Sequence, residues 1–405
     1  MANDEGNPND EFVAVRGSVR LGHALVILHS SFVIAPPPAT ASAPTGSERS
    51  FDCAPQSLRS VQDDGEREGA LRMTAHIAGL GWVTPLGTDL VDVFARIGRG
   101  ELAEVKAIAN PETGRALSYL PVPMKSVEAL GRNPRLRRAS AISYFGVAAG
   151  LAALADAGIV LTPELAARTA VVFAISNGGV IYTRKFFDQI VKQGAHAASP
   201  ALFPDTVYNA PASHLAALLG IDGASYTLVG DASVGLSALH FGAQLLATSD
   251  IEQVVVVGAE ECDWILCAAY TDWRLARTPL AEGAAAVVLR RAGRWRVQTH
   301  PGATFLRQRE AGAALAGVLG DFAGAKVERV IASANGTFID RAEAAGLAVH
   351  FPNVPVLAPK QSLGESPGAG ALMQTVAAAL TGGCALVTVV GFNQQTGAAL
   401  ITPTR

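Results

Sequence analysis

From Met73 to the C-terminus, short apolar runs that suit buried strands alternate with longer stretches that suit helices. Strands are predicted at residues 76–84, 169–175, 227–229, 253–257, 327–332 and 385–390, and helices at 139–158, 236–247 and 368–380. This alternation is typical of a layered α/β fold with buried sheets. The order of strand and helix signals in the second part of the chain repeats that of the first, which predicts two similar halves.

The composition allows a large core and excludes several classes of protein. Of the 405 residues, 49% are hydrophobic and 17% are charged, so the chain is not mostly disordered. Lys and Arg number 32 against 35 Asp and Glu, and the net charge of -3 supplies no basic field for nucleic acid or an anionic membrane. Because the sequence lacks the roughly 18 consecutive apolar residues of a membrane span, membrane insertion is not expected.

The cysteines favour a reducing compartment. Cys53, Cys262, Cys267 and Cys384 form no Cys-x-x-Cys pair and have no metal-type spacing to histidines. We therefore expect a cytoplasmic protein with free thiols, without a metal or cofactor.

Residues 1–72 differ from the rest. They begin with a polar run, contain a Pro-rich stretch at 35–44 and end in a charged run at 63–72, which predicts a disordered leader or an over-long start. A signal peptide around the apolar stretch 24–35 is the alternative. It is less favoured, because His29 interrupts that stretch and the stretch starts far from Met1.

The motifs after Met73 resemble those of the β-ketoacyl-acyl carrier protein synthases. The resemblance covers nearly all of the chain from Met73 to Arg405, and the order and spacing of the motifs carry it. They are Ile77-Ala-Gly-Leu-Gly-Trp-Val-Thr-Pro-Leu-Gly87, Ser176-Asn-Gly-Gly179, Ser199-Pro200, Phe203-Pro204, Asn209-Ala210, Leu219-Gly-Ile-Asp-Gly223, Tyr226-Thr-Leu-Val-Gly-Asp-Ala-Ser-Val-Gly-Leu-Ser-Ala-Leu-His240 and Leu280-Ala-Glu-Gly-Ala-Ala-Ala-Val-Val-Leu289.

The resemblance implies a thiolase-like layered αβαβα fold made of two pseudo-repeated halves, here placed at residues 73–265 and 266–405. It also implies a site with three chemical groups: a cysteine thiolate at the start of a helix that takes the acyl chain, and two histidines that drive decarboxylation and stabilise the oxyanion.

This sequence departs from the family at all three positions. Ala232 stands at the nucleophile position, and the neighbouring Ser233 is interpreted as a polar residue of the first helical turn, since no base is identifiable for it. Asn335 replaces the first histidine in Ser333-Ala-Asn-Gly-Thr337. Glu365 replaces the second in Lys360-Gln-Ser-Leu-Gly-Glu365, where the family's lysine is retained as Lys360. The family's closing loop appears as Gly391-Phe-Asn-Gln-Gln-Thr396, in which Phe392 is retained as the residue expected to bind substrate.

Two functions fit this pattern. In the first, the chain resembles a chain-length factor: a non-catalytic subunit of fatty acid or polyketide biosynthesis, aryl-polyene-type pathways included, that shapes the pocket for the growing chain. In the second, Glu365 is a general base and Asn335 an oxyanion donor, giving an acyl transferase or thioester hydrolase. A scaffold that only binds carrier protein has no positive support in the sequence.

The resemblance also implies partners. Condensing enzymes of this fold associate through the strand before the nucleophile turn, here Tyr226-Thr-Leu-Val229. We expect a dimer, with a catalytic ketosynthase subunit rather than with a second copy, and contact with an acyl carrier protein.

Overall fold

The computed structural model describes residues 72–404. The predicted leader and its signal-peptide alternative therefore lie, apart from Arg72, outside the described residues. Within residues 72–404, no helix combines the length and apolar character needed to cross a bilayer. Cys262, Cys267 and Cys384 are free thiols.

One sheet of 11 strands runs through both halves of the protein. The first half has the order β5-β4-β6-β8-β1 and the second β12-β11-β13-β14-β9, with β10 beside β14. The strands are β1 (Met73–Val83), β4 (Thr169–Ile175), β5 (Ser225–Val229), β6 (Gln253–Glu260), β8 (Gly283–Arg290), β9 (Trp295–Thr299), β10 (Ala303–Thr304), β11 (Arg329–Ile331), β12 (Val356–Leu357), β13 (Ala385–Val390) and β14 (Gln395–Pro403).

The two halves share one topology. In each, the strands that come third, second, fourth, fifth and first in the chain lie side by side in that order, and the same pairs are parallel. The halves meet where β1 and β9 pair in antiparallel fashion. The change from one half to the other thus falls between Arg290 and Trp295, later in the chain than the predicted boundary at residues 265/266.

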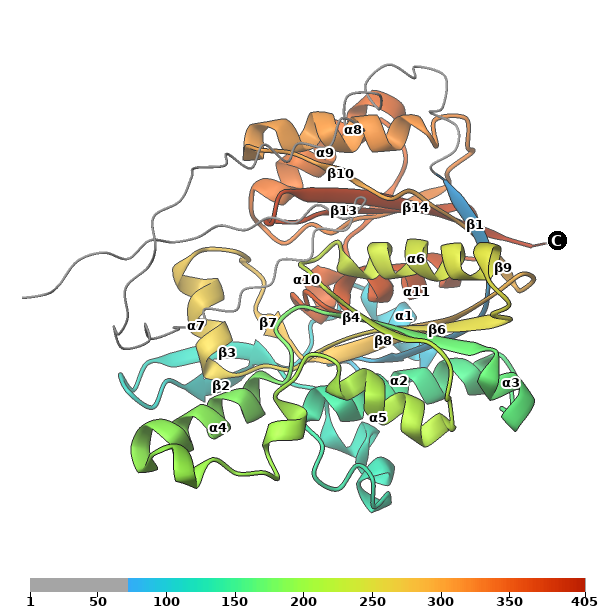
Figure 1. Ribbon diagram of the computed structural model, residues 1–405. Helices are drawn as coiled ribbons and strands as arrows, with labels where there is room; N and C mark the ends of the chain where they lie inside the picture. Colours follow the sequence, from blue (N-terminus) through green and yellow to red (C-terminus); the bar gives the residue numbers. More distant parts are fainter. Residues whose placement is uncertain (1–71, 405) are drawn as a thin grey trace, which may run out of the picture.

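Helices and sheet alternate as five layers, αβαβα, which confirms the predicted fold class (Figure 1). The outer layers contain α2 (Ala141–Asp156) and α5 (Ala210–Leu219) on the first half, and α8 (Ala311–Gly320) and α9 (Phe338–His350) on the second. The middle layer consists of α6 (Val234–Thr248) and α11 (Gly370–Leu380). α11 is almost wholly buried, while α6 is buried over most of its first three turns and exposed at its C-terminal end.

Small residues let these layers approach closely. A Cβ on Gly235 of α6 would lie 2.9 Å from the Cβ of Ala371 on α11, so the two helices meet there without side chains between them. On the outer face, Gly79 and Gly81 of β1 leave room for the carbonyl groups of α2, which rests on the strand. The Ala- and Gly-rich composition of the helices is therefore a packing requirement.

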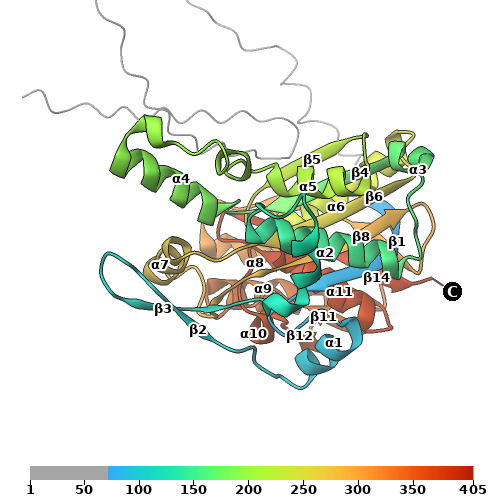
Figure 2. The same ribbon diagram turned by 90° about the horizontal axis from the view of Figure 1, so that it is seen from below.

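Among the remaining elements, α4 and α7 lie at one end of the layers and α3 at the opposite end (Figures 1 and 2). A second sheet has the order β2-β3-β7, and Figure 2 shows β2 and β3 on the same side of the molecule as α4 and α7. These elements are β2 (Lys106–Ala109), β3 (Ala116–Leu120), β7 (Leu280–Ala281), α1 (Leu90–Gly98), α3 (Pro163–Ala167), α4 (Val180–Gln193), α7 (Trp264–Asp272) and α10 (Lys360–Leu363).

Candidate functional site

The nucleophile position lies in the turn between β5 and α6. The strand ends at Val229, α6 begins at Val234, and Ala232 between them is only 3% exposed. Helix N-termini present free N–H groups and a partial positive charge, which suits a reactive thiolate. Here the side chain is the methyl group of Ala232. The turn therefore retains the partial positive charge of the helix N-terminus but has no sulfur atom that could form a thioester.

Ser233, the candidate substitute nucleophile, is the N-cap residue of α6, but its hydroxyl does not cap the helix. The Ser233 Oγ lies 3.1 Å from Asp231 Oδ1 and 2.8 Å from Gln395 Oε1. No histidine accepts its proton within the described residues. The structure thus brings no base to Ser233.

The loop after β11 places Asn335 in the same region. Its backbone N–H donates to Asp340 Oδ1 (2.9 Å) at the start of α9, and Gly336, at φ +87°, turns the chain there. The Asn335 side chain is buried. Its Nδ2 donates to Glu365 Oε2 (2.8 Å) and to the Leu275 carbonyl (3.1 Å), and its Oδ1 accepts from Thr337 (2.7 Å). Both amide hydrogens are therefore in use.

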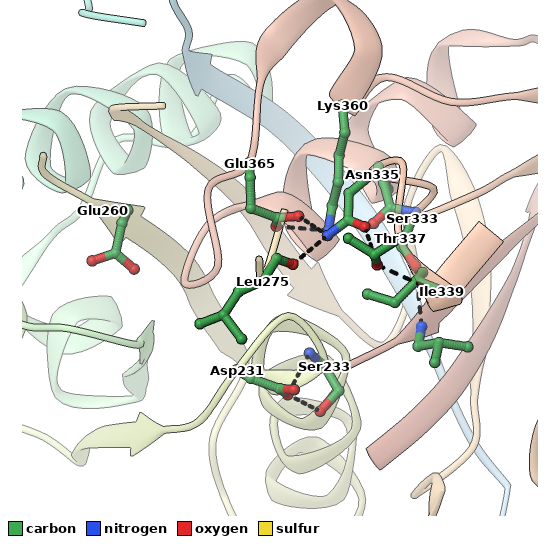
Figure 3. Close-up of polar contacts among 12 residues, drawn as sticks. Asp231, Ser233, Glu260, Leu275, Ser333, Asn335, Thr337, Ile339, Lys360 and Glu365 are labelled. Atoms are coloured by element: carbon green, nitrogen blue, oxygen red, sulfur yellow. Dashed lines mark hydrogen bonds and ion pairs between the residues drawn. The ribbon is translucent and has the colours of Figure 1, made fainter. Parts of the chain in front are cut away.

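Glu365 follows α10 and is fixed by its backbone beside β7. Its N–H donates to the Pro279 carbonyl (2.9 Å), and its own carbonyl accepts from Ala281 N–H (2.8 Å). Its Oε1 receives Lys360 Nζ at 2.7 Å, and both side chains are nearly fully buried. With Asn335 on the other oxygen, the carboxylate of Glu365 is held from both sides (Figure 3).

Of the three degenerate positions, Asn335 and Glu365 are in direct contact. Figure 3 shows Asp231 and Ser233 at the start of α6, facing the group formed by Lys360, Glu365 and Asn335. The two positions that would carry imidazoles are in direct contact with each other. Lys360 neutralises Glu365, and Asn335 donates a hydrogen bond to it. This group holds no nucleophile, and Ala232 supplies none. Within the described residues no cluster of His, Cys, Asp or Glu has the geometry to hold a metal ion.

Phe392 lies in the turn 391–394 between β13 and β14. Its ring packs edge-on against Tyr270 of α7, with ring centroids 5.7 Å apart. Tyr270 is buried, and burial raises the pKa of its phenol well above the ordinary value, with Glu365 and Glu260 adding to the shift. A phenol of this kind stays protonated at neutral pH and does not act as a base.

A cavity of about 710 Å³ opens beside this pair. Its lining includes Tyr270, Cys267, Leu117 and Thr337, and arginines at its edge. Among the described residues, the lining includes neither Ala232 nor Asn335 nor Glu365. The cavity therefore does not open onto these three predicted site residues.

Four carboxyl groups near the site hold their protons more tightly than usual. Burial raises the pKa of Glu260 to about 8, and those of Glu261, Glu282 and Glu343 to about 7, from an ordinary value of 4.5. Glu260 accepts from the N–H groups of Gly368 and Asn177, which lowers its pKa without offsetting burial. These carboxyls join backbone segments around the site.

We expect the free energy of unfolding to fall as pH rises from about 6.5 to about 8, since the unfolded carboxyls have then lost protons that the folded ones retain. Each carboxyl still protonated contributes about 1.4 kcal/mol per pH unit. His240, whose pKa burial lowers to about 4, has the opposite effect, but only below its unfolded pKa of 6.5. Urea unfolding at several pH values measures the slope; a flat or rising stability across this range would contradict the expectation.

Sequence reasoning missed three polar residues of this region: Asp231, Gln395 and Tyr270. Asp231 was detectable, because a carboxylate between an apolar strand and an apolar helix needs partners when it is buried. Gln395 and Tyr270 gave no such signal, since their contacts depend on the tertiary fold.

Comparisons with known proteins agree with the fold. Residues 128–293 match the N-terminal domain of β-ketoacyl synthases. The 3-oxoacyl-[acyl-carrier-protein] synthase 2 of Vibrio harveyi is 24% identical over 187 residues, which cover 46% of this chain and 45% of that protein. The protein of the same name from Vibrio cholerae serotype O1 is 28% identical over 125 residues, covering 31% of this chain and 30% of that protein. These matches span less than half the length of the curated relatives.

Solved structures of similar fold cover more of the chain. A β-ketoacyl synthase from Burkholderia phymatum superposes with a TM-score of 0.71 at 17% identity, over 82% of this chain and 100% of that one. The ishigamide ketosynthase/chain length factor gives 0.68 at 22% identity, over 82% and 100%. A ketosynthase in complex with its chain length factor from Xenorhabdus doucetiae gives 0.65 at 16% identity, over 82% and 98%.

At these identities the solved structures establish the fold, and the similarity in sequence is limited to part of the chain. Residues 128–293 are thus similar to the N-terminal domain of β-ketoacyl synthases, and the fold of the chain is that of solved ketosynthases.

Proposed function

We propose that this chain is a non-catalytic, chain-length-factor-like subunit that pairs with a catalytic ketosynthase in fatty acid or polyketide biosynthesis, aryl-polyene-type pathways included. One observation carries the proposal: Lys360, Glu365 and Asn335 form a closed buried network beside Ala232. A condensing site needs a nucleophile and groups free to receive a proton or stabilise an oxyanion. In this network the side chains of Lys360, Glu365 and Asn335 bond to one another, so none of them is free to act on a substrate.

The charges support the same conclusion. Decarboxylation of a malonyl unit places a negative charge on the enolate oxygen. A buried carboxylate nearby destabilises this second negative charge by repulsion. Lys360 offsets the charge of Glu365 at 2.7 Å, so the lysine is not free to offset an enolate as well. Decarboxylation at this site would first require the buried ion pair of Lys360 and Glu365 to break.

The alternative is an acyl transferase or hydrolase with Glu365 as base and Asn335 as oxyanion donor. It requires a free carboxylate oxygen and a free amide hydrogen at one point in space. Both oxygens of Glu365 are bonded, and both amide hydrogens of Asn335 are donated to protein acceptors. We therefore rank this reading second.

The edge of the sheet supports a partner subunit. β5 is the last strand of the first half and pairs only with β4 among the described strands. Tyr226 on this strand is 40% exposed and packs edge-on against Phe241 of α6 at 4.9 Å. Phe203 and Tyr208, in the segment before α5, also expose large aromatic surface. Related structures include a ketosynthase in complex with its chain length factor, which makes a ketosynthase the partner of choice.

The first test concerns covalent chemistry. The purified full chain, incubated with acyl and malonyl carrier protein, is expected to gain no acyl group and to release no carbon dioxide, because Ala232 has no nucleophile. Intact-protein mass spectrometry measures the first and a labelled malonyl group the second. A Glu365→Gln variant serves as control, since it should be as inactive as the wild type. An acyl adduct in peptide 226–236, or hydrolysis that Glu365→Gln abolishes, would contradict the proposal.

A cluster of exposed arginines supports contact with a carrier protein of acidic surface. Arg132, Arg135, Arg137 and Arg138 are exposed and form no ion pair with any described residue, in a protein whose net charge is -3. Unpaired positive charge of this density attracts an acidic partner and aligns it.

Changing Arg135 and Arg137 to Glu is expected to weaken binding of an acidic carrier protein about tenfold at low salt, with less effect at high salt. The double change to Lys keeps both charges and is the matched control. Titration calorimetry or fluorescence anisotropy gives the affinities. Equal affinity of the Glu and wild-type proteins at low salt would remove this segment from the carrier interface.

A further inference from the structure

Two buried cysteines flank the first turn of α7. Asp263 is the N-cap of this helix, its side chain accepts the N–H of Ile265, and its carbonyl accepts the N–H of Cys267 at 3.0 Å. Cys262 comes directly before the cap, and Cys267 is the fourth residue of the helix. Side chains at these two positions often pack against each other across the first turn, as a hydrophobic staple. The local geometry therefore brings the two thiols together.

The surroundings of the two thiols support this pairing. Cys262 is 4% exposed and Cys267 2%, and both belong to one apolar cluster with Leu117, Tyr270 and Leu280. Burial raises the pKa of the Cys262 thiol well above its ordinary value, and contact with the Cys267 thiol adds to the shift. The two sulfur atoms thus lie within reach of each other.

The two thiols differ in their access to solutes. Cys267 lines the cavity of about 710 Å³, together with Leu117 and Tyr270, whereas the described lining does not include Cys262. β3, which carries Leu117, packs against α7 and covers the pair from that side (Figure 2). A small solute that enters the cavity therefore meets Cys267 first.

We infer that Cys262 and Cys267 form a peroxide-responsive dithiol, which hydrogen peroxide or an organic hydroperoxide oxidises to an intramolecular disulfide. In the first step, the Cys267 sulfur bonds to one peroxide oxygen and the O–O bond breaks. The thiol proton leaves with the departing oxygen as water or an alcohol, and Cys267 becomes a sulfenic acid. In the second step, the Cys262 sulfur displaces the hydroxyl group, which leaves as water with the Cys262 proton. The two thiols lose two electrons and two protons, which the peroxide gains.

The order of the two steps follows from the positions of the thiols. Cys262 keeps its proton near neutral pH and lies outside the cavity lining, so it is not the first to meet the peroxide. Once Cys267 is a sulfenic acid, the Cys262 thiol reacts within the same molecule, and proximity offsets its low thiolate fraction. A low-molecular-weight thiol reverses the reaction by exchange.

The test treats the purified full chain with hydrogen peroxide, stops the reaction with catalase and adds iodoacetamide under denaturing conditions. Without reductant, peptide mass spectrometry should find the peptide that holds both cysteines unalkylated and lighter by two hydrogen atoms. Alkylation of Cys262 and Cys267 should fall at least about tenfold relative to untreated protein, and dithiothreitol should restore it. Cys384, in the apolar cluster of the second half, is the internal reference, because its thiol can gain oxygen but should not form this bond.

Three variants test the order of the steps. In Cys262→Ala, Cys267 should stop at the sulfenic acid, which dimedone labels. In Cys267→Ala, Cys262 should keep its thiol and take no label, because it is buried outside the cavity lining. Cys384→Ala is the matched control and should form the disulfide as the wild type does. Equal labelling of Cys262 and Cys267 in the two single variants would contradict the assigned order.

Peroxide-treated wild-type protein in which Cys262 and Cys267 stay alkylatable, or gain oxygen without forming the bond, would overturn the dithiol. So would a disulfide from either of them to Cys53 or Cys384. These outcomes are read from the chain without substitutions, so they hold even where a variant fails to fold. None of them bears on the proposed non-catalytic function, since the experiment uses neither a carrier protein nor a ketosynthase.

Discussion

Lys360→Met is expected to lower the free energy of unfolding by about 3–5 kcal/mol, because it leaves the carboxylate of Glu365 buried without its cation. Glu365 is 2% exposed and Lys360 3%, so water cannot replace the lost contact without opening the core. Methionine fills a similar volume, which keeps the effect electrostatic rather than steric. Urea unfolding monitored by circular dichroism measures the change.

The matched control is the double variant Lys360→Met with Glu365→Gln. The amide removes the stranded charge and can still accept the hydrogen bond from Asn335 Nδ2, so most of the lost stability should return. A loss under about 1 kcal/mol in the single variant, or no recovery in the double variant, would show that these side chains do not form a buried pair.

Thr227→Pro is expected to abolish pairing with the ketosynthase, weakening it at least about 100-fold. Ala224 accepts from Val171 N–H and Gly230 N–H donates to Ile175, so even-numbered residues of β5 bond to β4. The N–H of Thr227 therefore points away from the sheet, where an added strand would use it. Proline removes this donor while the bonds to β4 remain.

Thr227→Val is the control for this variant, because it keeps the N–H and the β-branched side chain. Co-purification and size-exclusion chromatography of the co-expressed pair report the assembly. A Thr227→Pro protein that folds and still co-purifies would place the partner on another surface.

The layered fold could be predicted because its strands are buried on both faces and read as continuous apolar runs. The predicted strands at 169–175 and 385–390 have the bounds of β4 and β13. Helix ends were predicted less well: the helix predicted at 139–158 spans Ala141–Asp156, and the N–H of the preceding Ser140 donates to Asp205. The interior strands β9 and β14 and the short β2-β3 pair were not predicted. β2, β3 and β9 are partly exposed, and partly exposed strands carry a weaker signal.

The site could be predicted as a set of positions but not as a network. Motif spacing named Ala232, Asn335 and Glu365 as site positions, and the structure places Asn335 and Glu365 in hydrogen-bond contact. The pairing of Lys360 with Glu365 and the contact with Asn335 depend on where Gly364, at φ +83°, turns the chain after α10. The Asp231 contacts depend on β13 and β14 meeting α6 through the fold, which no local pattern records.

The measurement that tests the central claim most directly is the product profile of a reconstituted pair. The ketosynthase from the same gene neighbourhood would be assayed with its carrier protein, with and without this chain, and the products resolved by mass spectrometry. The account predicts that the ketosynthase alone gives no product or products of other lengths, that adding this chain gives one defined length, and that this chain alone gives none. Condensation by this chain alone, or an identical product profile with and without it, would contradict the account.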